Sequence, residues 1–451
     1  MRELELAAHA LEHTDGDAQV TVVRERSLHA RFARSAPTQL TSIENVTVHV
    51  MALRNGHTGA ATTNRTDDDS LRETARRALD AANAAAATGR GDHPGLAQPQ
   101  AYRRHDGFDP ATAALDPGTT ADALGAAFAV AHEAGAEAFG LWTAGEVRTA
   151  IASMSGIAAQ DAVTDAFLKV VCRDEDGRSG FATGTAAAAA KIDPTEVAAR
   201  AAALMPRGPL EELAPGTYPV VLGPEAVGTI LAFLGGLAFN GMAHAEGRGA
   251  LTGRLGTRIA SPSINLSDSP RYAGTLPRAF DAEGVAKAPV PLVQDGVAHC
   301  VVHDLRSAAR AGDDARSTGH ATAPGGSPWG PAPTNLVLIG GGAEDEADLA
   351  RPIERGLFVN RLWYVNPVRE KETLLTGVTR DGTFLIEDGV ITRPVRDVRF
   401  TDSALGVLQR TQALTAEARL VGDAEFYGGR FATGTVCPAL RCSGLRITGG
   451  A

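Results

Sequence analysis

The sequence has little cysteine and no long apolar run. Its 451 residues include four cysteines, Cys172, Cys300, Cys437 and Cys442, which are too few and too scattered for a disulfide scaffold. No uninterrupted apolar stretch reaches the roughly eighteen residues that a membrane helix needs. The N-terminus carries acidic residues where a signal peptide has its apolar core. We therefore expect a reduced, cytoplasmic protein with no membrane span.

Basic residues are also scarce. The chain has 43 Lys and Arg against 53 Asp and Glu, which gives a net charge of −10. A surface that binds nucleic acid needs clustered Lys and Arg, so we expect no nucleic-acid partner. The hydrophobic content of 44% is enough for sizeable cores, and the length allows two or three domains.

Several common catalytic and cofactor motifs are missing. No G-x-S-x-G elbow occurs. Gly340, Gly341 and Gly342 follow an apolar stretch but lack the G-x-G-x-x-G spacing of a dinucleotide site, and the segment 245–254 lacks the Gly-Lys-Ser/Thr of a P-loop. We therefore expect no bound nucleotide.

One His-Glu pair resembles part of a zinc helix. His132 and Glu133 lie in an Ala-rich helical stretch, and a zinc helix needs a second histidine at position 136 or 137. Those positions hold Ala136 and Glu137 instead. The pair is therefore predicted to have no metal role.

The first two hundred residues combine strand and helix patterns. Strands, several with the apolar–polar alternation of a half-buried antiparallel sheet, are predicted at 18–25, 28–34, 45–54, 58–64, 141–150, 157–163 and 166–173. Helices are predicted at 3–13, 67–87, 119–136 and 194–203. Residues 1–205 are therefore predicted to form an N-terminal α+β domain, with an antiparallel sheet and flanking helices.

A Pro-rich stretch at residues 206–215 is predicted to be a linker, and residues 216–451 a second, strand-rich domain. This domain is predicted to contain a buried helix at 224–245 and another helix at 403–417. Asp381-Gly382 and Asp388-Gly389 are hairpin signals between strand patterns. The predicted architecture is α+β, with a curved, mostly antiparallel sheet around the first helix.

The segment from 247 to 304 carries an ordered set of motifs. In order these are Gly247-Arg248, Gly253-Arg254-Leu255-Gly256, Ser261-Pro262, Asp268, Pro270, Phe280-Asp281, Glu283-Gly284, Pro291-Leu292, Gly296 and His303-Asp304. Here the chain resembles the TldD/PmbA (TldE) family. The resemblance extends over nearly the whole chain and implies a two-subunit metallopeptidase that cleaves or matures extended peptides.

The chain departs from this family where the metal would be. The metal-bearing TldD branch has a His-Glu-x-x-x-His motif on the helix before the Gly-rich segment, but the corresponding window, 232–237, is AFLGGL. The late cysteine ligand of that branch would fall near 424–430, which is AEFYGGR. The Asn-Ser-Arg/Lys-Gly turn of relatives is Ser153-Met154-Ser155-Gly156 here.

The resemblance therefore implies the TldE-like, metal-free branch. This chain would hold no cofactor, zinc would be supplied by a TldD-like partner in a heterodimer, and the substrate would be a peptide; a homodimer is the other assembly. The alternative function is a stand-alone enzyme or binding protein of a specialised biosynthetic pathway, acting on a small peptide-like intermediate.

Candidate cleft or substrate-binding residues lie at two places, and no catalytic residue is assigned. The candidates are His244, Glu246, Arg248, Arg254, His303, Thr318 and His320. Glycines in the loop 245–256 permit close approach of a peptide or partner, although plain loop architecture is the alternative. Arg248 and Arg254 either donate forked hydrogen bonds to a peptide or pair internally with Asp268 or Asp281. His303, Thr318 and His320 either line the shared cleft or close a turn.

Overall fold

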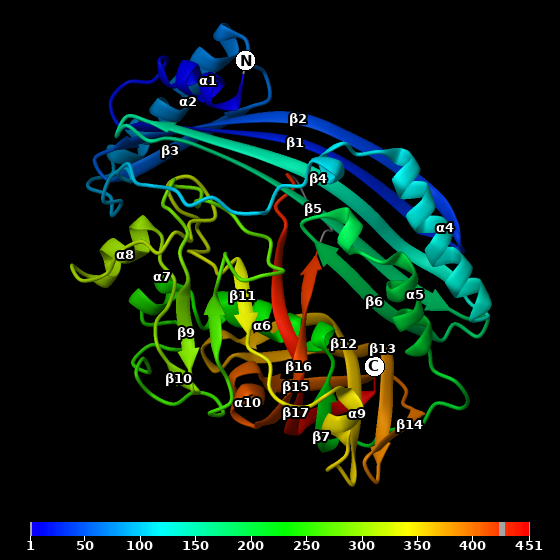
Figure 1. The fold of residues 1–451 in the computed structure, drawn as a ribbon. Coiled ribbons are helices and arrows are strands. Elements are labelled where there is room, and N and C mark those ends of the chain that lie inside the picture. The colour runs from blue at the N-terminus through cyan, green and yellow to red at the C-terminus, as the bar shows by residue number, and fades with distance from the viewer. Residues whose placement is uncertain (1, 424–428, 451) are drawn as a thin grey trace.

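The computed structural model describes residues 2–423 and 429–450. It contains two sheets, one built before residue 187 and one built after residue 215 (Figure 1). The proposed linker, residues 206–215, lies between them. No helix in the described residues is both long and apolar enough to cross a membrane.

The N-terminal sheet has six strands in the order β3-β2-β1-β4-β5-β6, and every neighbouring pair is antiparallel. The strands are β1 (Ala18–Ala33), β2 (Ala36–Arg54), β3 (His57–Thr63), β4 (Glu137–Ser153), β5 (Ala158–Arg173) and β6 (Ser179–Ala186). The helices are α1 (Glu3–Leu11), α2 (Asp68–Ala86), α3 (Pro110–Ala113), α4 (Pro117–Glu133), the 3₁₀ turn η1 (Ala189–Lys191) and α5 (Pro194–Ala203). The predicted antiparallel sheet with flanking helices is confirmed.

Aspartates cap the starts of α2, α3, α4 and α5. The Asp67 carboxylate accepts from the Ser70 amide at the start of α2, and Asp116 and Asp193 cap α4 and α5 in the same way. Proline follows Asp116 and Asp193 directly, where its fixed φ suits a first helical turn. The predicted starts at 67, 119 and 194 lie within two residues of the observed starts at Asp68, Pro117 and Pro194.

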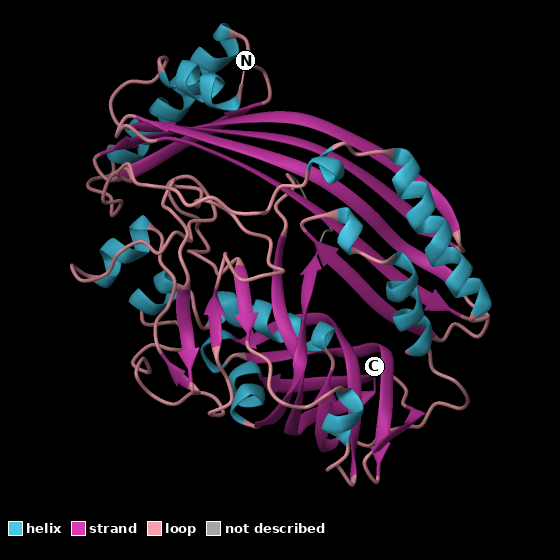
Figure 2. Cartoon of the chain, in the orientation of Figure 1, coloured by secondary structure: helices cyan, strands magenta, loops and turns pink. Residues whose placement is uncertain are grey.

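The two faces of the N-terminal sheet have different cover. Val20 and Val22 of β1 pack with α1 and α2, and Ala30 and Phe32 pack with α4 and α5. Because successive strand residues point to opposite faces, all four lie on one face of β1. The helices gather near the two ends of the arched sheet, while the other face looks toward the C-terminal region (Figure 2).

The C-terminal sheet has eleven strands. They are β7 (Gly216–Leu222), β8 (Leu266–Asp268), β9 (Val290–Gln294), β10 (Val297–Ala298), β11 (Asn335–Leu338), β12 (Arg355–Arg369), β13 (Leu374–Glu387), β14 (Val390–Pro394), β15 (Val398–Ser403), β16 (Thr411–Asp423) and β17 (Thr433–Gly450). The helices are α6 (Pro224–Leu237), α7 (Gly241–Ala245), α8 (Leu305–Ala311), α9 (Glu346–Ala350), the 3₁₀ turn η2 (Glu370–Glu372) and α10 (Ala404–Gln409). β7–β12 and β11–β17 pair in parallel, so this sheet is mixed rather than antiparallel throughout.

Helix α6 lies in the core of the C-terminal region, as predicted. Ile230, Leu231 and Leu234 are buried among strands of the sheet. The predicted helix 224–245 is two helices, because the chain breaks after Leu237 and Asn240 caps α7 by accepting from the Ala243 amide.

Two other predictions in this region are wrong in part. The predicted helix 403–417 stops at Gln409, and β16 follows because its residues pair with β17 along most of their length. At Asp381-Gly382 there is no turn: β13 continues, and both residues take positive φ in a bulge opposite β12. The hairpin at Asp388-Gly389 is confirmed.

Candidate functional site

A cavity of about 570 Å³ lies between the inner face of the N-terminal sheet and helix α6; we call it the α6 cavity. Its wall from the N-terminal sheet includes Phe167, Lys169, Phe181 and Thr183. Its wall from the C-terminal region includes Glu225, Thr229, Ala232, Phe233, Arg361, Trp363 and Thr435. The β16–β17 pair rises from the C-terminal region toward the arched sheet beside this space (Figure 1).

Helix α6 presents small and aromatic groups to this cavity. Ala232 and Phe233, the first two residues of the window where the TldD branch carries its metal motif, both line it. α6 contains one ionisable side chain, Glu225 in its first turn. The Glu225 carboxylate accepts from the Thr183 amide (3.2 Å) and hydroxyl (2.6 Å), and burial raises its pKa. This helix therefore has no donor set for zinc.

A second cavity of about 470 Å³, the His320 cavity, lies under the other part of the same sheet face. Strands β1, β2 and β4 form its roof, with Thr21, Glu25 and His49 among the lining residues. Lys287 and the segment 319–324 form its floor.

Asp268 anchors the floor of the His320 cavity. One carboxylate oxygen accepts from the amides of Thr334 and Asn335 (2.7 Å each), and the other faces His320 Nε2 (3.2 Å) and Lys287 Nζ (3.7 Å). Burial by itself would raise the pKa of Asp268, but Lys287, His320 and the amides outweigh it and lower the pKa well below its usual range. The carboxylate is thus held ionised in the interior.

Asp281 ties two motifs of the family pattern together. Its carboxylate accepts from the amides of Glu283 (3.0 Å), Val285 (2.9 Å) and Ala321 (2.8 Å). Burial, reinforced by the charge of Glu283, raises the pKa of Asp281 to about 7. Its partners are backbone groups, which makes it a scaffold for the loops at 281–285 and 319–321.

The arginines of the Gly-rich loop, Arg248 and Arg254, do not form the predicted ion pairs with Asp268 or Asp281. Asp268 is held by Lys287 and His320, and Arg248 Nε donates instead to Glu246 Oε2 (2.6 Å) on the surface. Arg254 is half-buried, and among the described residues it forms no ion pair with either aspartate. Both guanidinium groups thus lie outside the buried ionic cluster.

The second group of candidates forms a turn, and one member reaches a cavity. The Thr318 hydroxyl accepts from the His303 amide (2.7 Å), and His320 Nδ1 lies 2.8 Å from the Thr318 carbonyl. His320 lines the His320 cavity, whereas His303, Thr318, His244 and the Gly-rich loop do not line either cavity. Burial lowers the pKa of both His244 and His303. Whether these residues bind substrate remains a prediction.

Arg430 is the main interface residue that sequence reasoning missed. Its guanidinium makes two contacts to the Asp165 carboxylate of β5 (2.8 and 2.6 Å) and one to the Thr143 hydroxyl of β4 (2.9 Å), and its amide donates to Glu25 (2.8 Å). Gly145 leaves room for this guanidinium, since a Cβ there would lie 2.6 Å from Arg430 Nε. The signal available in the sequence was the polar residues on one face of β1, which need a polar partner when that face is covered. Most of the expected cysteine window, residues 424–428, lies outside the described residues.

Family models match the C-terminal sheet and the first three strands of the N-terminal sheet. The PmbA/TldA metallopeptidase C-terminal domain matches residues 215–449, and PmbA/TldA metallopeptidase domain 1 matches residues 18–82. The chain belongs to the TldD/PmbA family. In this family member, α6 and the motif-bearing loops around Asp268 and Asp281 are therefore homologous features of the C-terminal domain.

Named relatives agree with this assignment. The chain is similar to the crystal structure of TldE from Thermococcus kodakarensis, with a TM-score of 0.85, 18% identity and 99% of each chain covered, a likeness of fold. It is 26% identical over 205 residues to a metalloprotease of Methanothermobacter thermautotrophicus (46% of this chain, 44% of the relative). It is 24% identical over 242 residues to a metalloprotease TldD homolog of Haemophilus influenzae (52% and 48%). The chain thus matches about half the length of these curated relatives.

Proposed function

We propose that this TldD/PmbA family chain is a TldE-like subunit of a two-subunit metallopeptidase, without the catalytic zinc site. A TldD-like partner supplies the catalytic zinc, and this chain helps to enclose an extended peptide. The observation that carries the proposal is the face of α6, where Ala232 and Phe233 line a large cavity at the place of the metal motif. Because these side chains have no lone pair to offer, they cannot ligate zinc.

The walls of the α6 cavity suit a peptide. The hydroxyls of Thr183, Thr229 and Thr435 are hydrogen-bonding groups, and Phe167 and Phe233 add apolar surface for side chains. The lining is about equally polar and apolar, which suits a peptide that presents both backbone amides and side chains. The cavity volume of about 570 Å³ is in the range of such sites.

Exposed aromatic residues at the rim favour a protein partner. Trp363 is 41% exposed and its neighbour Tyr364 is 75% exposed. Trp363 also lines the α6 cavity, and the Arg380 guanidinium lies 4.1 Å from the centre of its ring. Aromatic residues and Arg are enriched at interfaces. A partner bound here would cover the mouth of the cavity.

Reconstitution tests the proposal. We expect neither this chain nor a TldD-like partner encoded with it to cleave peptides alone, and the mixture to do so, with the zinc held by the partner. Tyr364→Ala should weaken the complex at least about tenfold (1.4 kcal/mol), whereas Tyr272→Ala, at another exposed tyrosine, should not.

Two results would contradict this function. One is peptidase activity of the isolated chain that depends on zinc and disappears in His244→Ala or His303→Ala. The other is a chain that stays monomeric in sedimentation at tens of micromolar with the partner present. Self-association without a partner would favour the homodimer.

A further inference from the structure

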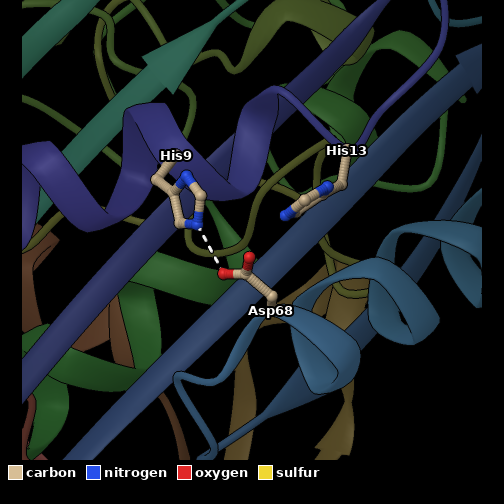
Figure 3. Close-up of side chains that lie close together, drawn as sticks. All are labelled: His9, His13 and Asp68. Atoms are coloured by element: carbon tan, nitrogen blue, oxygen red, sulfur yellow. Dashed lines mark hydrogen bonds and ion pairs between the residues drawn. The ribbon is translucent and has the colours of Figure 1, made fainter.

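A cluster of side chains of metal-binding types lies on the helix-covered face of the N-terminal sheet, opposite the cavities. His9 is on α1, His13 lies just beyond its end, and Asp68 is the first residue of α2 (Figure 3). α1 carries His9, and the turn that follows α1 brings the His13 ring to the same side, toward α2 (Figure 3). One potential ligand atom from each of the three residues lies within 4.8 Å of the others.

The distances suit a small divalent ion. His9 Nε2 is 2.7 Å from Asp68 Oδ1, and the two imidazole rings meet edge to face with centroids 5.3 Å apart. Zinc bonds of 2.0–2.2 Å in tetrahedral geometry separate ligand atoms by about 3.4 Å. Small side-chain rotations therefore convert this cluster into three ligands of one ion, with the fourth position open to water.

His9 also has the outer contact that a metal-bound histidine usually has. Its other ring nitrogen, Nδ1, lies 3.3 Å from Glu12 Oε2. Ligating histidines commonly donate their free N–H to a carboxylate, which fixes the tautomer and leaves the opposite nitrogen for the metal. Glu12 is placed for that role, with Nε2 of His9 directed at Asp68.

His13 provides the independent observation. Its Nε2 is buried and has no hydrogen-bond partner among the described residues. Figure 3 shows its ring directed toward His9 and Asp68. A proton shared by His9 and Asp68 explains their contact without a metal, but it leaves the buried nitrogen of His13 unsatisfied. Buried polar atoms are rarely left so, and a bound ion would satisfy this one.

We propose that His9, His13 and Asp68 form a site for Zn²⁺, or a similar imidazole-binding divalent ion, that ties α1 to α2. Two imidazoles and a carboxylate are ligands that zinc accepts. α1 and α2 cover the face of the sheet opposite the cavities, so the ion would stabilise the N-terminal helices and take no part in peptide cleavage. This inference is independent of the proposed function.

Calorimetric titration of the full chain with Zn²⁺ tests the site. We expect about one Zn²⁺ per chain with a dissociation constant of about 10 μM or tighter. His13→Asn and Asp68→Asn should each weaken binding at least about tenfold (1.4 kcal/mol). Zn²⁺ should also raise the melting temperature of the wild type, since it binds the native state, and leave that of His13→Asn unchanged.

Three controls separate this site from other histidines. His132→Ala removes an exposed helical histidine, and His244→Ala and His303→Ala remove histidines of the C-terminal region; all three should bind Zn²⁺ as the wild type does. Equal melting temperatures of wild type and His13→Asn without metal show that the variant is folded. No binding by the wild type, or equal binding by wild type and His13→Asn, overturns the proposal.

Discussion

The two faces of the N-terminal sheet are covered in different ways. The helix-covered face is apolar, and Val20, Val22 and Phe32 pack against helices. The inner face carries many more polar residues, yet Glu25 is only 7% exposed and Ser27 is fully buried. Alternation of apolar and polar residues thus predicts the two faces, but it does not predict that the polar face meets water.

The two faces need different kinds of contact from the elements that cover them. Apolar burial is non-directional and scales with area, so a helix of the right shape is sufficient. A buried polar group needs a partner in the right place, because an unsatisfied one costs about 1–3 kcal/mol. Arg430, which reaches Asp165, Thr143 and Glu25, meets that need on the inner face. The polar face therefore specifies how the two regions dock.

The largest effect is expected from breaking this polar docking. Arg430→Ala leaves the buried Asp165 carboxylate without its charge partner, and we expect a loss of about 3–5 kcal/mol in the free energy of unfolding. Urea unfolding followed by the fluorescence of buried Trp142 measures it. Arg419→Ala, which breaks a surface pair with Glu417, should cost at most about 1 kcal/mol. Equal losses of unfolding free energy in Arg430→Ala and Arg419→Ala would show that the buried polar contacts are worth no more than a surface pair.

A somewhat smaller loss is expected at the floor of the His320 cavity. Asp268→Asn removes the charge that Lys287 and His320 face, at a cost of about 3 kcal/mol at pH 7. The pKa of Asp268 is lowered in the folded state, so the wild type's advantage is present above the unfolded pKa of about 3.9 and is lost as the pH falls below it. Unfolding curves at pH 7, 5, 4 and 3 test this. A difference that does not narrow in acid would be evidence against an ionised Asp268.

A conservative substitution on the apolar face should cost less free energy of unfolding than one on the polar inner face. Leu71 of α2 is fully buried against the sheet, and Leu71→Met keeps its volume, so we expect a loss below about 1.5 kcal/mol. Arg430→Lys is equally conservative in size but loses the two-pronged contact to Asp165, at about 2 kcal/mol or more. Urea unfolding of both variants measures the two losses. A larger loss in Leu71→Met than in Arg430→Lys would show that hydrogen-bond geometry does not matter at the interface.

The smallest stability effect belongs to the Gly-rich loop. Arg248 is an exposed residue paired with Glu246, so Arg248→Ala should change the free energy of unfolding by no more than about 0.5 kcal/mol. If this arginine engages the substrate or the partner, the activity of the reconstituted pair should fall at least about tenfold (1.4 kcal/mol). A variant that loses several degrees of melting temperature but keeps its activity per folded molecule would make the loop a scaffold.

Features with local signals were predictable from the sequence. The aspartates before α2, α4 and α5 mark helix starts, and helical spacing at Ile230, Leu231 and Leu234 identifies α6.

Features that depend on distant residues were not predictable. Residues 411–417 look helical on their own, but pairing with β17 makes them part of a strand, since tertiary contacts override weak propensity. Asp381 looks like a turn residue, but it lies in a bulge where its carboxylate binds Ser179 and Arg361. The role of Arg430 depends on Asp165, 265 residues away in the chain.

Strand β17 imposes an order on folding. It pairs with β7, β11, β15 and β16, so the C-terminal sheet lacks a shared central strand until residues 433–450 are available. The strands of the N-terminal sheet, by contrast, all precede residue 187. During synthesis the N-terminal sheet is complete before β7 is made, whereas both partners of β7, β12 and β17, follow much later in the chain, and long-range pairing of this kind is slow. The polar inner face of that sheet is the surface that remains hydrated during the wait.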